Sequence, residues 1–199
     1  MSKTQGARDK EPAAVIRTFI CIEIPESIKA RIDRLQETLR QIDGQVSWTA
    51  PSNIHLTLKF LGGVAASRIE SISKALESAA QGISPFEIEV SGAGCFPSPQ
   101  SPRVLWVGFS SAPEPLKQLY SNIEDQLARE RFPRETRKFS PHLTIGRIRE
   151  PHNAAGIAEA LIANGVETEK FTAREVILMR SDLRPTGSIY TPQAVIQLS

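Results

Sequence analysis

Two nearly identical tetrapeptides, HLTL beginning at His55 and HLTI beginning at His142, are the stretches of the sequence best suited to chemistry. The chain contains only three histidines, and two of them occupy this repeated motif. Because side chains alternate between the faces of a strand, each histidine shares a face with the threonine two residues later, Thr57 or Thr144. Each copy therefore predicts one imidazole and one hydroxyl side by side on a polar face.

Two imidazoles across one cleft suit general acid–base catalysis of phosphoryl transfer. With ordinary pKa values of about 6.5, one ring can be neutral and the other protonated near neutral pH. The neutral ring accepts a proton from a nucleophile, and the charged ring donates one to a leaving group. Arg147 could neutralise the phosphate, but strict alternation places it on the opposite face. A bulge or strand end at Gly146 would be needed to turn it toward the site.

Simpler interpretations exist for each histidine. A single His-x-Thr on a strand is usually structural, but the doublet in a matched context favours a functional site. Zinc is a poor alternative, because no Cys, Asp or Glu stands near either motif at ligand spacing, so no metal is expected. His152 precedes a predicted short helix and is expected to be a surface loop residue.

The elements that position the motifs follow a repeated order, strand–helix–strand–helix–strand. Strands are predicted over residues 17–24, 54–62, 86–96, 103–109, 139–148, 173–183 and 190–198. Apolar stripes predict one helix after Pro25 that ends at Gly44, and others starting near Ile69, Leu116 and Asn153. Ser67 and Glu70 have the spacing of a capping box. Strand alternation places Lys59 on the polar face and Phe60 in the core.

This repeat predicts an α+β fold with two pseudo-symmetric lobes of mainly antiparallel sheet, helices on the outer faces and an active groove between the lobes. Residues 1–16 are polar and are expected to form a disordered tail. Residues 17–199 are expected to form a single bilobal domain, with lobe-forming repeats at about 17–97 and 103–198.

The composition is typical of a soluble globular protein: 199 residues, 40% hydrophobic, 23% charged and a net charge of +2. A uniformly basic nucleic-acid coat is therefore not expected, although a local basic groove is compatible with this charge. No 18-residue apolar stretch occurs, so no membrane association is predicted. The two cysteines form no CxxC motif and suggest reduced thiols in a cytoplasmic protein.

A basic segment leads into the second histidine motif. Its cations are Arg129, Arg131, Arg134, Arg137 and Lys138. Two interpretations remain open: a solvated loop of mixed charge, or a basic lip that guides an RNA backbone toward the groove. Phe132, Phe139 and Trp48 could likewise stack on bases or belong to the core.

The two motifs, together with the phrases FICIEIP, LKFLG, KFSPHLTIGR and LMRSDLRPTGSIY, resemble the two-histidine phosphoesterase superfamily. Within it, roughly residues 17–198 are similar to the RNA 2',3'-cyclic phosphodiesterase family, also called 2'-5' RNA ligase. The resemblance implies metal-independent opening of a terminal 2',3'-cyclic phosphate to a 2'-phosphomonoester, with no cofactor. It implies that His55 is the proton donor to the departing 3' oxygen and that His142 is the proton acceptor that activates water. Thr57 and Thr144 would bind the phosphate, and Arg147 matches an arginine that follows the second motif in this family.

The resemblance also implies weak, reversible joining of tRNA halves through a 2'-5' linkage, and nucleotide binding in the groove as in some family members. A monomer is expected. Two other functions remain open. One is a phosphodiesterase for small cyclic nucleotides or ADP-ribose cyclic phosphate, substrates of other branches of the superfamily. The other is a module that binds RNA ends and keeps only vestigial activity, although both threonines are intact.

Overall fold

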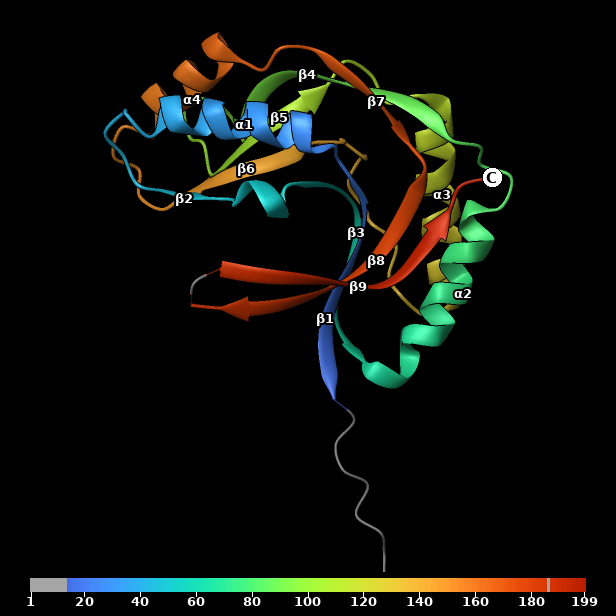
Figure 1. Cartoon of the computed structure of the whole chain (residues 1–199). Helices are drawn as coiled ribbons and strands as arrows, with labels where there is room; N and C mark the ends of the chain where they lie inside the picture. Colours follow the sequence, from blue (N-terminus) through green and yellow to red (C-terminus); the bar gives the residue numbers. More distant parts are fainter. Residues whose placement is uncertain (1–13, 186) are drawn as a thin grey trace, which may run out of the picture.

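The computed structural model describes residues 14–185 and 187–199. Within this part of the chain, nine strands form one curled sheet in which every pairing is antiparallel (Figure 1). The strands are β1 (Val15–Glu23), β2 (Val46–Trp48), β3 (His55–Ala65), β4 (Phe86–Phe96), β5 (Val104–Phe109), β6 (Leu143–Ile148), β7 (Glu169–Ala173), β8 (Glu175–Arg184) and β9 (Gly187–Gln197). Their order is β7-β4-β5-β6-β3-β1-β8-β9, and β2 pairs with β6.

Helices cover the outer side of this sheet. They are α1 (Glu26–Leu39), α2 (Ile69–Ala80), α3 (Glu114–Arg129) and α4 (Ala154–Asn164), with short 3₁₀ turns η1 (Pro51–Asn53) and η2 (Ala66–Arg68). In Figure 1, α1 and α4 lie over β4, β5 and β6, whereas α2 and α3 flank β8 and β9. The α+β class and the bilobal antiparallel architecture are therefore confirmed. No helix in the described ranges is long and apolar enough to cross a membrane.

The two lobes exchange elements between the sequence repeats. One lobe contains β3, β1, β8 and β9, and the other contains β2, β6, β5, β4 and β7. Thus β4 of the first repeat pairs with β5 of the second, and β8 of the second pairs with β1 of the first. The expectation that repeats 17–97 and 103–198 each form a lobe is corrected accordingly. Sequence patterns predict the type of each element, whereas strand partners depend on contacts between distant segments.

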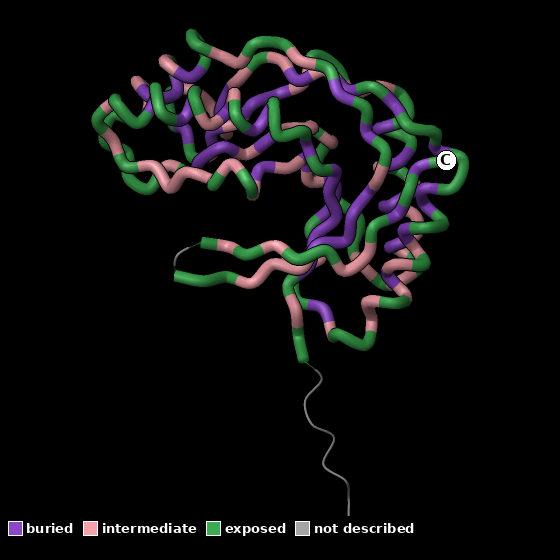
Figure 2. The backbone as a smooth tube through the Cα atoms, in the orientation of Figure 1, coloured by how far each residue is buried: buried purple, intermediate pink, exposed green. Residues whose placement is uncertain are grey.

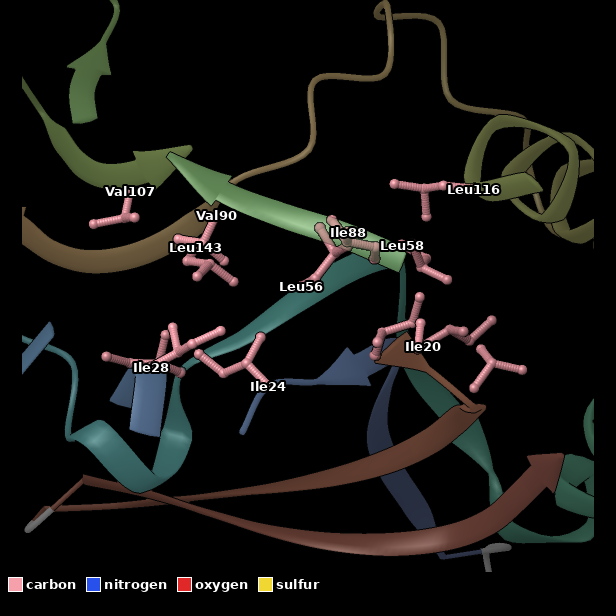
Figure 3. Close-up of a cluster of buried hydrophobic side chains, with 14 of the residues drawn as sticks. Ile20, Ile24, Ile28, Leu56, Leu58, Ile88, Val90, Val107, Leu116 and Leu143 are labelled. Carbon is pink, nitrogen blue, oxygen red and sulfur yellow. The ribbon is translucent and has the colours of Figure 1, made fainter. Parts of the chain in front are cut away.

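One continuous hydrophobic core lies between the sheet and the helices. Figure 3 shows side chains from both lobes in it, including Ile20, Leu56 and Leu58 from one and Val107 and Leu143 from the other. Figure 2, in which the trace is coloured by residue burial, shows the buried residues along the central strands. A second, smaller cluster lies apart from this core and contains Phe19, Cys21, Ile177 and Met179, with Tyr190 packed against it. This smaller cluster contacts the first histidine of the candidate site, through Phe19 and Tyr190.

The beginning of the chain differs from the prediction. Most of the expected disordered tail, residues 1–13, lies outside the described residues. Val15 and Ile16 belong to β1, where they pair with Ala65 and Val64 of β3. The predicted tail is therefore wrong at its last residues, because backbone pairing with β3 extends the strand.

Other element boundaries also differ. The capping box is wrong: Ser67 lies in η2, and α2 begins at Ile69 with no side-chain hydrogen bond at its N-terminus. The short strands β2 and β7 were not predicted, and β6 begins at Leu143 rather than at residue 139. These elements are short, so their ladder partners rather than their own sequence patterns decide where they begin and end.

Candidate active site

A single strand pair brings the two histidine motifs together. Leu56 of β3 and Leu143 of β6 are direct antiparallel partners, and both are fully buried. The side chains flanking each leucine therefore point to the opposite face of the sheet. In this register His55 lies opposite Thr144, and the other threonine, Thr57, lies opposite His142. The four predicted side chains thus share one face around a pseudo-twofold axis through the leucine pair.

Both imidazoles are held in the same way. Nδ1 of His55 lies 2.8 Å from the carbonyl oxygen of Asn53, and Nδ1 of His142 lies 2.7 Å from that of Ser140. A carbonyl oxygen only accepts hydrogen bonds, so Nδ1 carries the hydrogen in both rings. Within the described ranges, Nε2 of neither ring makes a hydrogen bond. Each ring therefore has one nitrogen fixed by the backbone and one available for proton transfer.

The surroundings of His55 are aromatic. Its ring stacks on Phe19 at a centroid distance of 4.6 Å and meets the edge of Tyr190 at 5.4 Å. Burial against these groups lowers the pKa of His55 to about 4, the Asn53 carbonyl opposes this shift, and the positive charge of Lys29 adds to it. His55 is therefore neutral near pH 7 in the free protein.

The second histidine has different aromatic neighbours. The ring of Phe96 meets His142 edge-on at 5.1 Å, and Phe96 in turn contacts Trp106 at 5.3 Å. Trp106 is also the strand partner of Thr144. The surroundings of His55 and His142 are thus alike in the backbone hydrogen bond to each ring. They differ in the side chains that enclose the ring.

A bulge in β3 changes which side chains share the face of His55. Ile20 pairs with Lys59 and Cys21 pairs with Thr57, so Leu58 is an extra residue in the ladder. Lys59 is therefore buried on the helix-covered side, and Phe60 is 71% exposed. The prediction that Lys59 shares the polar face and that Phe60 is in the core was wrong, because alternation reverses at a bulge.

A second bulge turns Arg147 toward the site. Leu105 pairs with Gly146 and Trp106 pairs with Thr144, so Ile145 is the extra residue. Arg147 is exposed and lines the same cavity as His55. The bulge lies one residue before Gly146, the position suggested by the sequence. A Cβ at Gly146 would lie 2.9 Å from the Val46 side chain, so glycine is required by close packing with β2.

A cavity of about 710 Å³ opens beside His55. Its lining residues come from β2 and η1 on one side and from β8 and β9 on the other. Figure 1 shows β2 and η1 facing the β8–β9 pair across this space. Its lining includes Glu23, Ser47, Trp48, His55, Arg147 and Tyr190, whereas His142 lies outside it. Trp48 also packs against the core and under Arg40, so it belongs to both the core and the cavity wall. Sequence reasoning missed Tyr190, whose only signal was its place in the family phrase ending in GSIY.

The basic segment before His142 is only partly available to a ligand. Arg134 pairs with Asp125 at 2.5 Å. The ring of Phe132 lies under Arg68 at 4.5 Å, and Phe139 stacks on Tyr120 at 4.0 Å. Both phenylalanines pack against the hydrophobic core, which supports the core interpretation. Exposed cations with no ion pair in the described ranges are Arg129, Arg131, Arg137 and Lys138, and the basic lip remains a prediction.

The third histidine has no part in this arrangement. His152 is 68% exposed in a loop before α4, and its Nε2 lies 3.0 Å from Asp43, as expected for a surface loop residue. Among residues 14–185 and 187–199, no group of three His, Cys, Asp or Glu side chains is placed to hold a metal ion.

Two consecutive stretches, residues 22–106 and 107–190, each match the family model described as LigT like phosphoesterase. The chain belongs to the LigT-like phosphoesterase family. The two matches correspond to the two repeats that carry His55 and His142. The resemblance to the two-histidine phosphoesterases is therefore confirmed at the level of the family.

Individual LigT-like relatives align over most of the chain. An RNA 2',3'-cyclic phosphodiesterase of Methanothermobacter thermautotrophicus is 36% identical, over 92% of this chain and 99% of its own length. One from Thermotoga maritima is 33% identical, over 88% of this chain and 91% of its own length. The crystal structure of E. coli LigT complexed with 3'-AMP superposes with a TM-score of 0.74 at 26% identity, covering 94% of this chain and 99% of that one.

Proposed function

We propose that this protein hydrolyses RNA 2',3'-cyclic phosphate ends to 2'-phosphomonoesters by a two-histidine acid–base mechanism. The observation that carries the proposal is the Leu56–Leu143 pair, because it sets two His/Thr pairs across one pseudo-twofold axis. In-line displacement at phosphorus needs its attacking and leaving oxygens on opposite sides of the phosphorus atom. Two imidazoles related by such an axis can serve one oxygen each. The names of the relatives support the same substrate class.

The proposed step moves two protons and exchanges one phosphorus–oxygen bond. A water molecule attacks phosphorus while Nε2 of His142 takes its proton. The bond from phosphorus to the 3' oxygen breaks, and Nε2 of His55 gives that oxygen a proton. The 2' bond stays, so the product is a 2'-phosphomonoester. The hydroxyls of Thr57 and Thr144 donate to non-bridging oxygens.

Arg147 is proposed to neutralise the phosphate. It reaches the cavity of His55 because of the Ile145 bulge, and no carboxylate in the described ranges pairs with it. A guanidinium can donate two parallel hydrogen bonds to phosphate oxygens. The anionic phosphate also favours the charged form of His55, so binding supplies the condition under which this ring can act as the donor.

The remaining predictions concern the partner and its surroundings. With an RNA 5'-hydroxyl in place of water, the same proton transfers join two ends through a 2'-5' phosphodiester. Joining of tRNA halves, a monomeric state and a cytoplasmic location are predictions from the sequence that fit this function.

The test is hydrolysis of an oligoribonucleotide with a 2',3'-cyclic phosphate end, in EDTA, with the product compared with 2'- and 3'-phosphate standards. We expect a 2'-phosphate. His55→Ala and His142→Ala should each lower kcat by about 10²–10⁴-fold, because each removes one proton transfer. His152→Ala is the matched control and should retain wild-type turnover.

Three results would reject the proposal: an intact cyclic end, a 3'-phosphate product, or full activity in either of the first two variants. Tight binding of a 2'-phosphate end without turnover would instead support the RNA-end-binding module.

A further inference from the structure

A second arginine stands beside Arg147 on the same face of the sheet. Arg149 follows it by two residues, and the amide of Arg149 donates to the carbonyl of Gln45 at 2.8 Å, so the backbone pairing of β2 and β6 continues to this point. Side chains two residues apart on a regular strand share a face. Arg147 and Arg149 therefore form a row that leads away from the histidine pair.

A hydrogen bond confirms the direction of Arg149. Its Nη2 lies 3.1 Å from the hydroxyl of Ser47, and Ser47 is the direct strand partner of Arg147. Ser47 and Arg147 both line the cavity beside His55. Arg149 thus stands at the rim of that cavity, with one guanidinium nitrogen held by a hydroxyl of its wall.

Neither arginine is neutralised within the described ranges. Other arginines on the surface have carboxylate partners, such as Arg31 with Glu169 at 2.8 Å and Arg134 with Asp125 at 2.5 Å. No such ion pair involves Arg147 or Arg149. Two exposed, unpaired guanidinium groups on one strand face attract anions, and the phosphodiester backbone of RNA is such an anion.

The spacing of the two arginines fits a particular ligand. Two residues along a strand span roughly 6.8 Å, which is the scale on which successive phosphates follow one another in an extended single strand. The cavity wall on the β1 side contributes Glu23, whose carboxylate repels phosphate. A nucleotide whose cyclic phosphate lies at the histidines would therefore direct its 5' side toward Arg149.

We propose that Arg149, held by Ser47, binds the phosphodiester on the 5' side of the terminal nucleotide. This inference rests on the proposed function and deepens it: the substrate is an RNA chain, and a nucleoside 2',3'-cyclic phosphate lacking a 5' phosphate leaves this site empty. Arg149 is a specificity residue in this proposal, because it does not reach the reacting phosphate.

The test is equilibrium binding of three product-like ligands: a nucleoside 2'-phosphate, the same nucleoside with an added 5'-phosphate, and a dinucleotide ending in a 2'-phosphate. The dinucleotide places a diester at the site, and the second ligand places a monoester there. We expect the wild type to bind the dinucleotide about tenfold more tightly than the nucleoside 2'-phosphate, the scale of a hydrogen bond to a charged group. Arg149→Ala should bring this ratio near one, and Ser47→Ala should lower it partly.

Arg34→Ala is the matched control, because Arg34 is exposed on α1, and it should keep the wild-type ratio. The salt dependence of dinucleotide affinity should also fall in Arg149→Ala, by a slope of about 0.7 in log–log form for one phosphate contact. An unchanged ratio in Arg149→Ala, or an equal loss for all three ligands, would overturn the inference. A preference limited to the 5'-phosphorylated nucleoside would also overturn it, because the site would then recognise a monoester and not an RNA chain.

Hydrolysis is measured separately on the oligoribonucleotide with a 2',3'-cyclic phosphate end, so the two proposals can fail independently. Hydrolysis with an unchanged affinity ratio in Arg149→Ala rejects the Arg149 site alone. Absence of hydrolysis with a ratio that still depends on Arg149 rejects the proposed activity and retains the RNA-chain site.

Discussion

The ammonium of Lys59 lies 2.7 Å from the carboxylate of Glu124, and both side chains are 7% exposed. Lys59 also donates to the carbonyl of Pro133 at 2.8 Å, and the amide of Glu135 donates to Glu124 at 3.0 Å. This buried pair therefore ties β3, which carries His55, to the segment that leads into His142. The bulge at Leu58 is what directs Lys59 to this position.

Replacing Lys59 with Met should lower the free energy of unfolding by about 3–5 kcal/mol, because Glu124 would be left charged and buried without its partner. Replacing both residues, as in Lys59→Met with Glu124→Leu, should recover most of this loss. Urea unfolding of the single and double variants gives the free energy of unfolding of each. Lys74→Met, at an exposed pair with Glu70, should show no comparable change. A single variant as stable as the wild type would contradict the assigned role.

Burial of His55 predicts a specific pH dependence of stability. Its folded pKa of about 4 lies below its ordinary value of about 6.5, so the unfolded chain takes up a proton first as the pH falls. The contribution of His55 to the free energy of unfolding is fully present above pH 6.5. It is lost progressively as the pH falls to 4. We expect the wild type to lose up to about 1.4 kcal/mol per pH unit more than His55→Asn in this window. The free energy of unfolding is measured by urea unfolding at several pH values. If it falls equally with pH in wild type and His55→Asn, the assignment is refuted.

Phosphate binding should raise the pKa of His55, because an anion beside the ring favours its charged form. An NMR titration of the imidazole should give about 4 in the free protein and a higher value with a saturating nucleoside 2'-phosphate. By linkage, affinity for that ligand should increase as the pH falls toward the new pKa. The signals of His152 are the internal control. A pKa that stays at about 4 in the complex would argue against His55 as the proton donor.

Arg147→Ala should lower kcat/KM for a 2',3'-cyclic phosphate end by about 10²-fold, the scale of losing one group that stabilises developing charge. Arg147→Lys should recover part of this, since a lysine supplies the charge without the paired donors. Steady-state kinetics on the oligonucleotide measure both variants, with Arg34→Ala as the control. A loss below threefold in Arg147→Ala would show that the Ile145 bulge does not direct this residue to the phosphate.

Much of the site could be predicted from local sequence rules. The repeated tetrapeptide and the alternation of a strand were sufficient to place His55 with Thr57 and His142 with Thr144. The apolar stripes predicted the four helices, because a period of 3.6 residues is a direct consequence of helix geometry. The same local rules misplaced Lys59 and Phe60, because one extra residue at Leu58 reverses the alternation of the positions that follow it, until a second irregularity at Leu61.

By itself, the sequence determined the types of the longer elements, the internal repeat and the pairing of each histidine with its threonine, since all three follow from short-range backbone periodicity. Only the tertiary structure decided that β3 lies beside β6, that β4 and β8 change lobes, and that bulges at Leu58 and Ile145 turn Lys59 away and Arg147 inward. It also decided that Phe19 and Tyr190 enclose His55 and lower its pKa. These features depend on contacts between residues far apart in the chain, which no local pattern specifies.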